Sequence, residues 1–198
     1  MTTNQKEINI KKLINSYTIE TTPNVYNKFM SLSEYLPYGN DVYVSYLPDE
    51  DPTRVINTSK NIIKEGLNAI PHLPARTIKD YSMLEKYIGN LSEVAGCNKI
   101  LVIGGSGKQI GNITSSIEVL ETNLLSKFNF KQVGLAGHPE GHKEISNNDL
   151  DEIIIKKNQL ANNVDFKIYL ATQFFFEAES FELWEKHINL LGNKLEIH

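Results

Sequence analysis

Short apolar runs rich in β-branched residues alternate with helical patterns, and this alternation restricts the possible folds more than any other feature of the chain. The apolar runs occupy residues 17–20, 42–47, 69–73, 99–103, 132–136, 167–172 and 194–197. The clearest helical patterns occupy residues 53–64, 81–94, 115–127, 150–162 and 177–191. Successive runs start roughly 30 residues apart, which is the size of one strand–helix unit. Strict alternation of this kind predicts a parallel sheet covered by helices.

The chain length leaves two ways of arranging such a sheet. With 198 residues the sequence predicts a single domain, 1–198, since domains commonly have 50–250 residues. A complete (β/α)8 barrel needs about 250 residues, and this sequence stops inside its seventh predicted strand. The sheet is therefore either an open α/β sheet or a barrel that lacks its last one and a half units.

Composition excludes several classes of protein. The net charge is −4, which is a poor match for a nucleic-acid binder because phosphate binding requires a basic field. The single cysteine, Cys97, excludes an internal disulfide and a cysteine-rich zinc site. No apolar run approaches the ~20 residues that span a bilayer, so we expect no membrane partner and a cytoplasmic location.

Polar residues gather where the predicted strands end. In parallel α/β folds the loops that follow the strands form one rim, and ligands bind there. We therefore expect one cavity to receive Glu20, Ser45, His72, Ser106, His138, Glu140, His142 and Gln173. Each of these residues also has a structural interpretation, because a strand-end carboxylate can cap the next helix and a histidine in an apolar strand can be a core residue.

Two motifs in this set do not meet the requirements of well-known sites. The glycine-rich segment 104–108 lacks the glycine and the Ser or Thr of a P-loop, and Ile110 stands where a Rossmann fingerprint needs glycine. His138 and His142 are spaced i, i+4, but the glycines and the proline around them predict a loop, and metal binding needs three convergent ligands. We expect no metal.

Four segments resemble the methylenetetrahydrofolate reductase family. They are AIPHLPAR at 69–76, LVIGG at 101–105, GLAGHPEGH at 134–142 and ATQFFFE at 171–177. The resemblance extends roughly from residue 17 to 198. It implies a TIM (β/α)8 barrel with only about six and a half βα units present. It also implies FAD at the barrel rim, a hydride that passes from NAD(P)H to the flavin, and interconversion of 5,10-methylenetetrahydrofolate and 5-methyltetrahydrofolate in one-carbon metabolism.

The resemblance implies roles for individual residues. Glu20 takes the place of the general acid that protonates the folate, and Gln173 takes the place of a glutamine that holds its pterin. The family commonly has Arg-Gly-Asp where this chain has Gly104-Gly105-Ser106. A catalytic Ser106 brings no charge, and the loss of one preorganised electrostatic group costs roughly 10²–10³ in rate.

The remaining implied contacts are to the cofactor. They are made by Ser45, His72, Gly104, Gly105, His138 and Lys157. The altered segment 104–106 leaves two alternatives to a flavoenzyme. One is a relative that transfers hydride from NAD(P)H to folate without flavin, and the other is a non-catalytic barrel that binds folate or a protein partner. An incomplete barrel has two free sheet edges, so we also expect a homo-oligomer.

Overall fold

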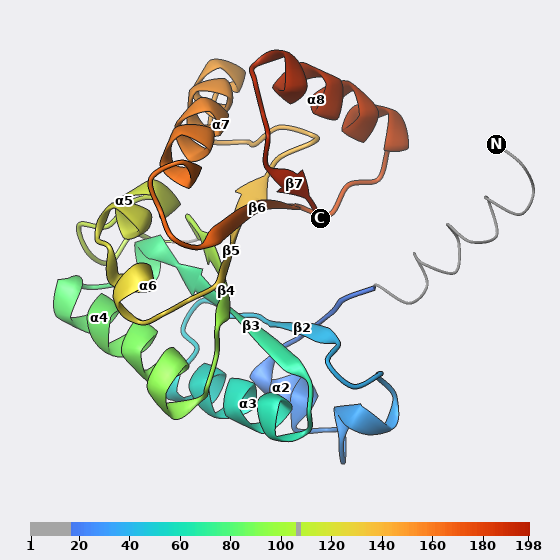
Figure 1. Cartoon of the computed structure of the whole chain (residues 1–198), viewed down its shortest axis with the longest axis vertical. Helices are drawn as coiled ribbons and strands as arrows, with labels where there is room; N and C mark the ends of the chain where they lie inside the picture. Colours follow the sequence, from blue (N-terminus) through green and yellow to red (C-terminus); the bar gives the residue numbers. More distant parts are fainter. Residues whose placement is uncertain (1–16, 106–107) are drawn as a thin grey trace, which may run out of the picture.

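A seven-stranded parallel sheet forms the centre of the computed structural model, which describes residues 17–105 and 108–198 (Figure 1). The strands lie in the order in which they occur in the sequence, and each pairs in parallel with the next. They are β1 (Ile19–Thr21), β2 (Asp41–Val44), β3 (Asn68–Pro74), β4 (Lys99–Ile103), β5 (Gln132–Gly137), β6 (Lys167–Thr172) and β7 (Glu196–Ile197).

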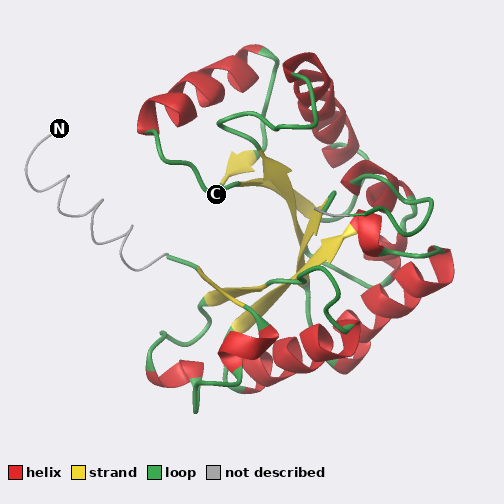
Figure 2. Cartoon of the chain, turned by 180° about the vertical axis from the view of Figure 1, so that it is seen from behind, coloured by secondary structure: helices red, strands yellow, loops and turns green. Residues whose placement is uncertain are grey.

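Helices follow the strands and lie on the outer side of the curled sheet, as both views show (Figures 1 and 2). The α-helices are α2 (Pro23–Tyr26), α3 (Pro52–Lys64), α4 (Tyr81–Gly89), α5 (Ser116–Glu121), α6 (Leu124–Lys127), α7 (Asn147–Ala161) and α8 (Ala178–Leu190). Shorter turns are η1 (Leu32–Glu34), η2 (Ala75–Thr77) and the π-helical η3 (Asn90–Val94).

Local sequence explains where these helices begin and end. Asp51 caps α3, because its side chain accepts the backbone N–H of Thr53 at 2.8 Å. Ser115 and Glu118 form a reciprocal cap on α5, in which each side chain accepts a backbone N–H at the start of the helix. Gly66 follows α3 at φ +80°, a left-handed conformation in which glycine carries no Cβ penalty.

The two faces of the sheet have different surroundings. Alternate strand residues such as Val44, Val102 and Leu135 pack against the helices in the main hydrophobic core. Leu101 and Tyr169 are also buried but lie outside that core, because they point to the inner, concave face. The concave face is therefore the surface of the sheet that the described helices leave uncovered.

The expectation of a TIM (β/α)8 barrel is wrong. The described residues form one open sheet, and β1 and β7 at its edges do not pair with each other. Closure requires hydrogen bonds between the two edge strands, and here the last strand has only two residues. The structure has the open sheet that the sequence left as the other possibility, although the sheet is strongly curled (Figure 2).

Candidate functional site

The carboxyl ends of β1 and β2 place an acid and a hydroxyl together. Glu20 lies in β1, and Ser45 directly follows β2 and is buried. The Oγ of Ser45 donates a hydrogen bond to the Glu20 carboxylate. A backbone hydrogen bond from Ser45 N to Thr21 O, 2.9 Å long, extends the pairing of the two strands and fixes this position. The Glu20 carboxylate is thus held at the strand ends, where ligands bind in parallel sheets.

His72 in β3 lies beside this pair and has an unused nitrogen. Its ring meets the Tyr43 ring edge-on, with 5.9 Å between the centroids. Its Nε2 atom is buried and has no hydrogen-bond partner among the described residues. Burial lowers the pKa of His72, and the negative charge of Glu20 opposes part of that change. The imidazole is therefore neutral near pH 7, and one of its nitrogens is left for a ligand.

Two tyrosines meet across the concave face. The hydroxyls of Tyr43 in β2 and Tyr169 in β6 lie 3.0 Å apart, although three strands separate β2 from β6. In a flat sheet these two strands would lie about 19 Å apart, so the contact requires the curl. Gly134 makes room for Tyr169, because a Cβ at this position would lie 2.8 Å from atoms of the phenol. Burial raises the pKa of both hydroxyls, so both are protonated at neutral pH.

Sequence reasoning missed these tyrosines. The signal was present, because Tyr43 and Ser45 are two residues apart and side chains with that spacing share one face of a strand. The ring of His198 packs on Tyr169 with 4.5 Å between the centroids, so the final residue of the chain also borders the concave face.

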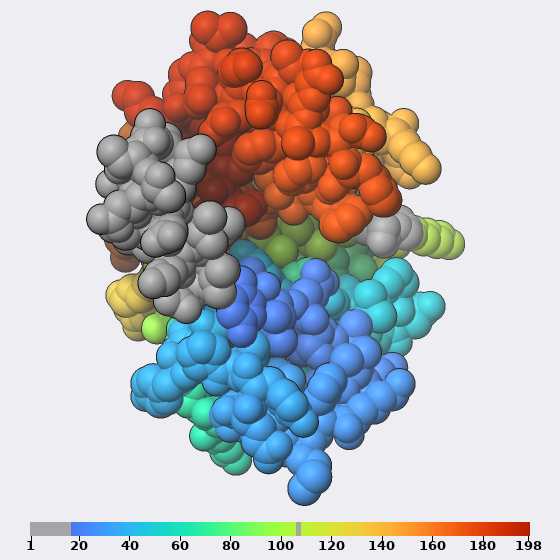
Figure 3. Space-filling view, turned by 90° about the vertical axis from the view of Figure 1, so that its right-hand side faces the viewer, coloured from blue at the N-terminus to red at the C-terminus, as the bar shows by residue number. Residues whose placement is uncertain are grey.

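Figure 3 looks toward the open side of the curled sheet. The blue segment that contains β1 lies below, the orange and red segment from β6 to β7 lies above, and green atoms of the middle strands are visible between them. We therefore define the concave site as Glu20, Tyr43, Ser45, His72 and Tyr169.

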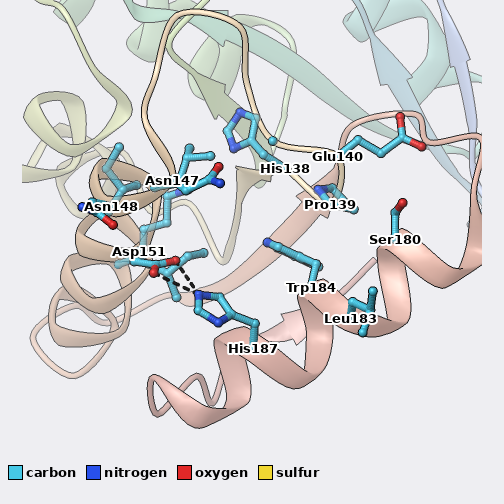
Figure 4. A pocket seen from close by; sticks show the side chains of 15 residues that line it. His138, Pro139, Glu140, Asn147, Asn148, Asp151, Ser180, Leu183, Trp184 and His187 are labelled. Atoms are coloured by element: carbon cyan, nitrogen blue, oxygen red, sulfur yellow. Dashed lines mark hydrogen bonds and ion pairs between the residues drawn. The ribbon is translucent and has the colours of Figure 1, made fainter.

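His138 and Lys157 lie at a second location, apart from the concave site. Together with the loop that follows β5, helices α7 and α8 enclose a pocket of about 590 Å³ (Figure 4). Its lining includes His138, Glu140, Asp151, Lys157, Trp184 and His187 and none of the residues of the concave site. We call it the α7–α8 pocket. The single cavity expected from the sequence is thus divided between two locations.

The α7–α8 pocket contains two perturbed bases. Lys157 is buried, and its Nζ donates to the Ala136 carbonyl at 2.6 Å. Burial lowers the pKa of Lys157 to about 8. Burial also lowers the pKa of His138 to about 4, and the positive charges of Lys157 and His142 add to that effect. In the same pocket, His187 Nε2 lies 2.8 Å from an Asp151 carboxylate oxygen (Figure 4).

Glu140, His142 and Gln173 make local contacts rather than contacts with the concave site. The Glu140 carboxylate accepts the backbone N–H groups of Phe176 and Glu177 at 2.9 and 3.2 Å, just before α8. The His142 ring packs edge-on against that of His138, at 5.3 Å between the centroids. The backbone N–H of Gln173 donates to Gly137 O at 2.9 Å, and the residue is exposed.

The end of β4 offers open backbone. A Cβ at Gly104 would meet no atom of the described residues within 4 Å, so these residues leave the chain open to a ligand here. Gly105 has φ +88°, and a Cβ there would lie 2.8 Å from the Cβ of Pro74. Ser106, the expected catalytic serine, lies outside the described residues.

Two further observations concern metals and membranes. Over residues 17–105 and 108–198, no three His, Cys, Asp or Glu side chains converge as metal ligands would. None of the helices in these ranges combines the length and the apolar character that crossing a bilayer requires.

No protein-family model matches the chain. A similar solved structure is that of a metagenomic short-chain oxidoreductase (SDR) in complex with NADP. It has a TM-score of 0.36 and 8% sequence identity, and the match covers 93% of this chain and 96% of that chain. A likeness of this size carries no argument about the reaction of this protein.

The expected membership of the methylenetetrahydrofolate reductase family is wrong, because no family model matches the chain, that of the expected family included. The four segments that carried the resemblance are short and lie at strand ends. Glycine, proline and histidine recur there because many parallel sheets need tight turns and polar rims at those positions.

Proposed function

We propose that the protein is an oxidoreductase that transfers hydride between NAD(P)H and a small molecule bound at the concave site. One observation carries the proposal: the Glu20 carboxylate, held by Ser45, is near enough to act on the charge of His72, whose buried Nε2 has no hydrogen-bond partner among the described residues. Hydride addition to a C=N or C=O group needs a partner that supplies or removes a proton, and a positioned carboxyl group does this.

In the proposed reaction, each residue of the concave site has its own role. Glu20 in its acid form donates a proton to the substrate. The Ser45 hydroxyl donates its hydrogen bond to the Glu20 carboxylate and so holds that group in position. Neutral His72 forms a hydrogen bond through Nε2 to the bound ring, while the Tyr43 and Tyr169 rings border the site. The hydroxyl pair of these two tyrosines keeps that border fixed in place.

The residues also fit a nicotinamide or flavin cofactor. The buried, unpaired nitrogen of His72 suits a polar atom on a flat ring, and the backbone at Gly104 is open to a ligand. NAD(P)H supplies the hydride when bound, and a flavin, when bound, relays it.

At a finer level we propose a tetrahydrofolate derivative as the substrate and FAD as the relay. An acid beside aromatic rings suits a flat, nitrogen-rich pteridine, because such rings pack on aromatic faces and their nitrogens accept protons. The reaction would interconvert 5,10-methylenetetrahydrofolate and 5-methyltetrahydrofolate. The identity of the substrate and of the relay cofactor is tested separately from the general class of reaction.

The decisive variant is Glu20→Gln, which keeps the size and polarity of the side chain but cannot donate a proton as an acid. We expect kcat for NAD(P)H oxidation with 5,10-methylenetetrahydrofolate to fall about 10²–10⁴-fold, the usual contribution of general acid catalysis. Glu34→Gln is the matched control, because Glu34 is an exposed acid in η1, away from the strand ends. If the Glu20→Gln variant turns over its substrate as fast as the natural protein, Glu20 is not the general acid.

The cofactor is tested by the visible absorbance spectrum of the purified protein, recorded without oxygen before and after addition of 5-methyltetrahydrofolate. A flavin band that bleaches supports both FAD and the folate. A colourless protein that still oxidises NAD(P)H supports direct transfer. A protein that binds folate without any turnover contradicts the oxidoreductase proposal.

A further inference from the structure

The α7–α8 pocket contains a base that the proposed reaction does not use. Lys157 lies on α7 with only 2% of its surface exposed, yet it belongs to the lining of a cavity of about 590 Å³. Its Nζ makes one hydrogen bond, to Ala136 O, although an ammonium group has three N–H donors. Among the described residues no carboxylate forms an ion pair with it.

Two acids of the pocket form hydrogen bonds with groups other than Lys157. The Glu140 carboxylate accepts two backbone N–H groups, and Asp151 contacts His187. A buried amine without a counter-charge favours its neutral form, and the lowered pKa of Lys157 agrees with this. A neutral amine has a free electron pair and is a nucleophile.

The other side chains of the pocket suit a small organic ligand. Trp184 offers an aromatic surface, and Asn147, Asn148 and Ser180 offer uncharged hydrogen-bonding groups (Figure 4). His138 belongs to the lining of the same pocket as Lys157 and provides a second wall, on the loop that follows β5.

We propose that Lys157 captures an aldehyde or ketone in the α7–α8 pocket as a Schiff base. The amine nitrogen forms a bond to the carbonyl carbon, and one N–H proton of the neutral amine moves to the carbonyl oxygen to give a carbinolamine. The C–O bond then breaks, the hydroxyl group takes up the second N–H proton and leaves as water, and a C=N bond joins the ligand to Lys157. No electrons are gained or lost overall. The site is separate from the concave site, so it stands whether or not the proposed hydride transfer does.

Lys156 provides an internal control. It precedes Lys157 in the same helix, but its side chain is 51% exposed and its Nζ lies 3.1 Å from a Glu121 carboxylate oxygen. Any difference in reactivity between the two lysines therefore reports the pocket and not the helix. Lys156→Met and Lys157→Met are the matched variants, because Met is unbranched and follows the path of the lysine stem.

The probe is 4-formylbenzoate with sodium cyanoborohydride at pH 7, and the reduced adducts are mapped by tandem mass spectrometry. We expect Lys157 to be labelled at least about 10-fold faster than Lys156, because an amine with a pKa near 8 has roughly 200 times more neutral form at this pH than an ordinary lysine. Lys157→Met should lose the fast adduct, and Lys156→Met should keep it.

Labelling of Lys157 at the rate of Lys156 or slower would overturn the proposal, and Lys157 would then act only as a hydrogen-bond donor to the end of β5. If Lys157→Met does not fold, the ratio of the two lysines in the natural chain still decides the outcome. Loss of hydride transfer in the Glu20 variant has no bearing on this result.

Discussion

At the scale of single residues, His138 combines burial with a nearby positive charge. Both act in the same direction, and they lower its pKa from 6.5 to about 4. In the unfolded chain the imidazole takes up a proton near pH 6.5, whereas in the folded protein it does so only near pH 4. The unfolded state therefore binds more protons between these two values, and the folded protein loses stability as the pH falls through this window.

We expect His138→Gln to flatten the pH dependence of the unfolding free energy between pH 6.5 and pH 4. The difference is bounded by roughly 3 kcal/mol, from about 1.4 kcal/mol per pKa unit, and partial exposure of the ring reduces it. Urea unfolding at several pH values measures the effect. An unchanged slope in the variant would show that His138 is not the group responsible.

The sequence predicted part of the candidate site. Glu20, Ser45 and His72 were predicted to share a cavity, and they do meet, because a side chain in a strand has its face fixed by two-residue alternation. His138 and Lys157 follow or lie beyond β5, where the path of the loop decides which side of the sheet a residue reaches. No local pattern encodes that path.

At the scale of elements, Glu65 ties the segment after β1 to the end of α3. Its carboxylate accepts hydrogen bonds from Tyr26 Oη at 2.5 Å, Ser31 Oγ at 2.9 Å, Leu32 N at 2.6 Å and Ser33 N at 3.0 Å. Burial works to raise the pKa of Glu65, but these hydrogen bonds outweigh it and lower the pKa. The segment that they hold directly follows the strand of Glu20.

Glu65→Ala should destabilise the protein by about 2 kcal/mol, because hydrogen bonds to a charged group are worth roughly 1.5–3 kcal/mol. Urea unfolding measures the change in unfolding free energy. Hydrogen exchange at the Leu32 and Ser33 amides shows whether the effect arises at the segment that Glu65 holds. Glu34→Ala is the control, since Glu34 is exposed in the same segment. Unchanged exchange at both amides would contradict this role.

The elements themselves were largely predictable from pattern. Strands 99–103 and 167–172 agree with the structure to the residue. The single helix expected at 115–127 is divided into α5 and α6, because Asn123 has a left-handed backbone with φ +60°. The helix expected at 81–94 ends as an α-helix at Gly89 and continues as a π-helical turn. Apolar periodicity is insensitive to such local changes in the backbone.

At the scale of the whole molecule, β1 and β7 are the edge strands of the sheet that the described residues form, and they do not pair with each other. Directly after β7, His198 N donates to Leu170 O at 2.8 Å, while Ile197 of β7 is the residue paired with Leu170. In a parallel ladder this arrangement turns the N–H and C=O of Ile197 away from β6, toward the free edge. Edge closure could not be read from the sequence, because it depends on contacts between segments far apart in the chain.

Unpaired edges recruit other strands, so we expect the chain to self-associate through β7. Ile197→Pro removes the outward N–H without removing a bond to β6, and it should weaken association by about 1 kcal/mol, the usual net value of a hydrogen bond. Ile197→Val keeps the N–H and should associate normally. Sedimentation at several concentrations measures the constants, and identical behaviour of the two variants would exclude this edge.

The contact between Tyr43 and Tyr169 joins the second and sixth strands. It acts as a brace that sets the curvature of the sheet, and with it the distance between the two ends of the arc. A ligand bound at the concave site therefore lies in a space whose width this contact helps to fix.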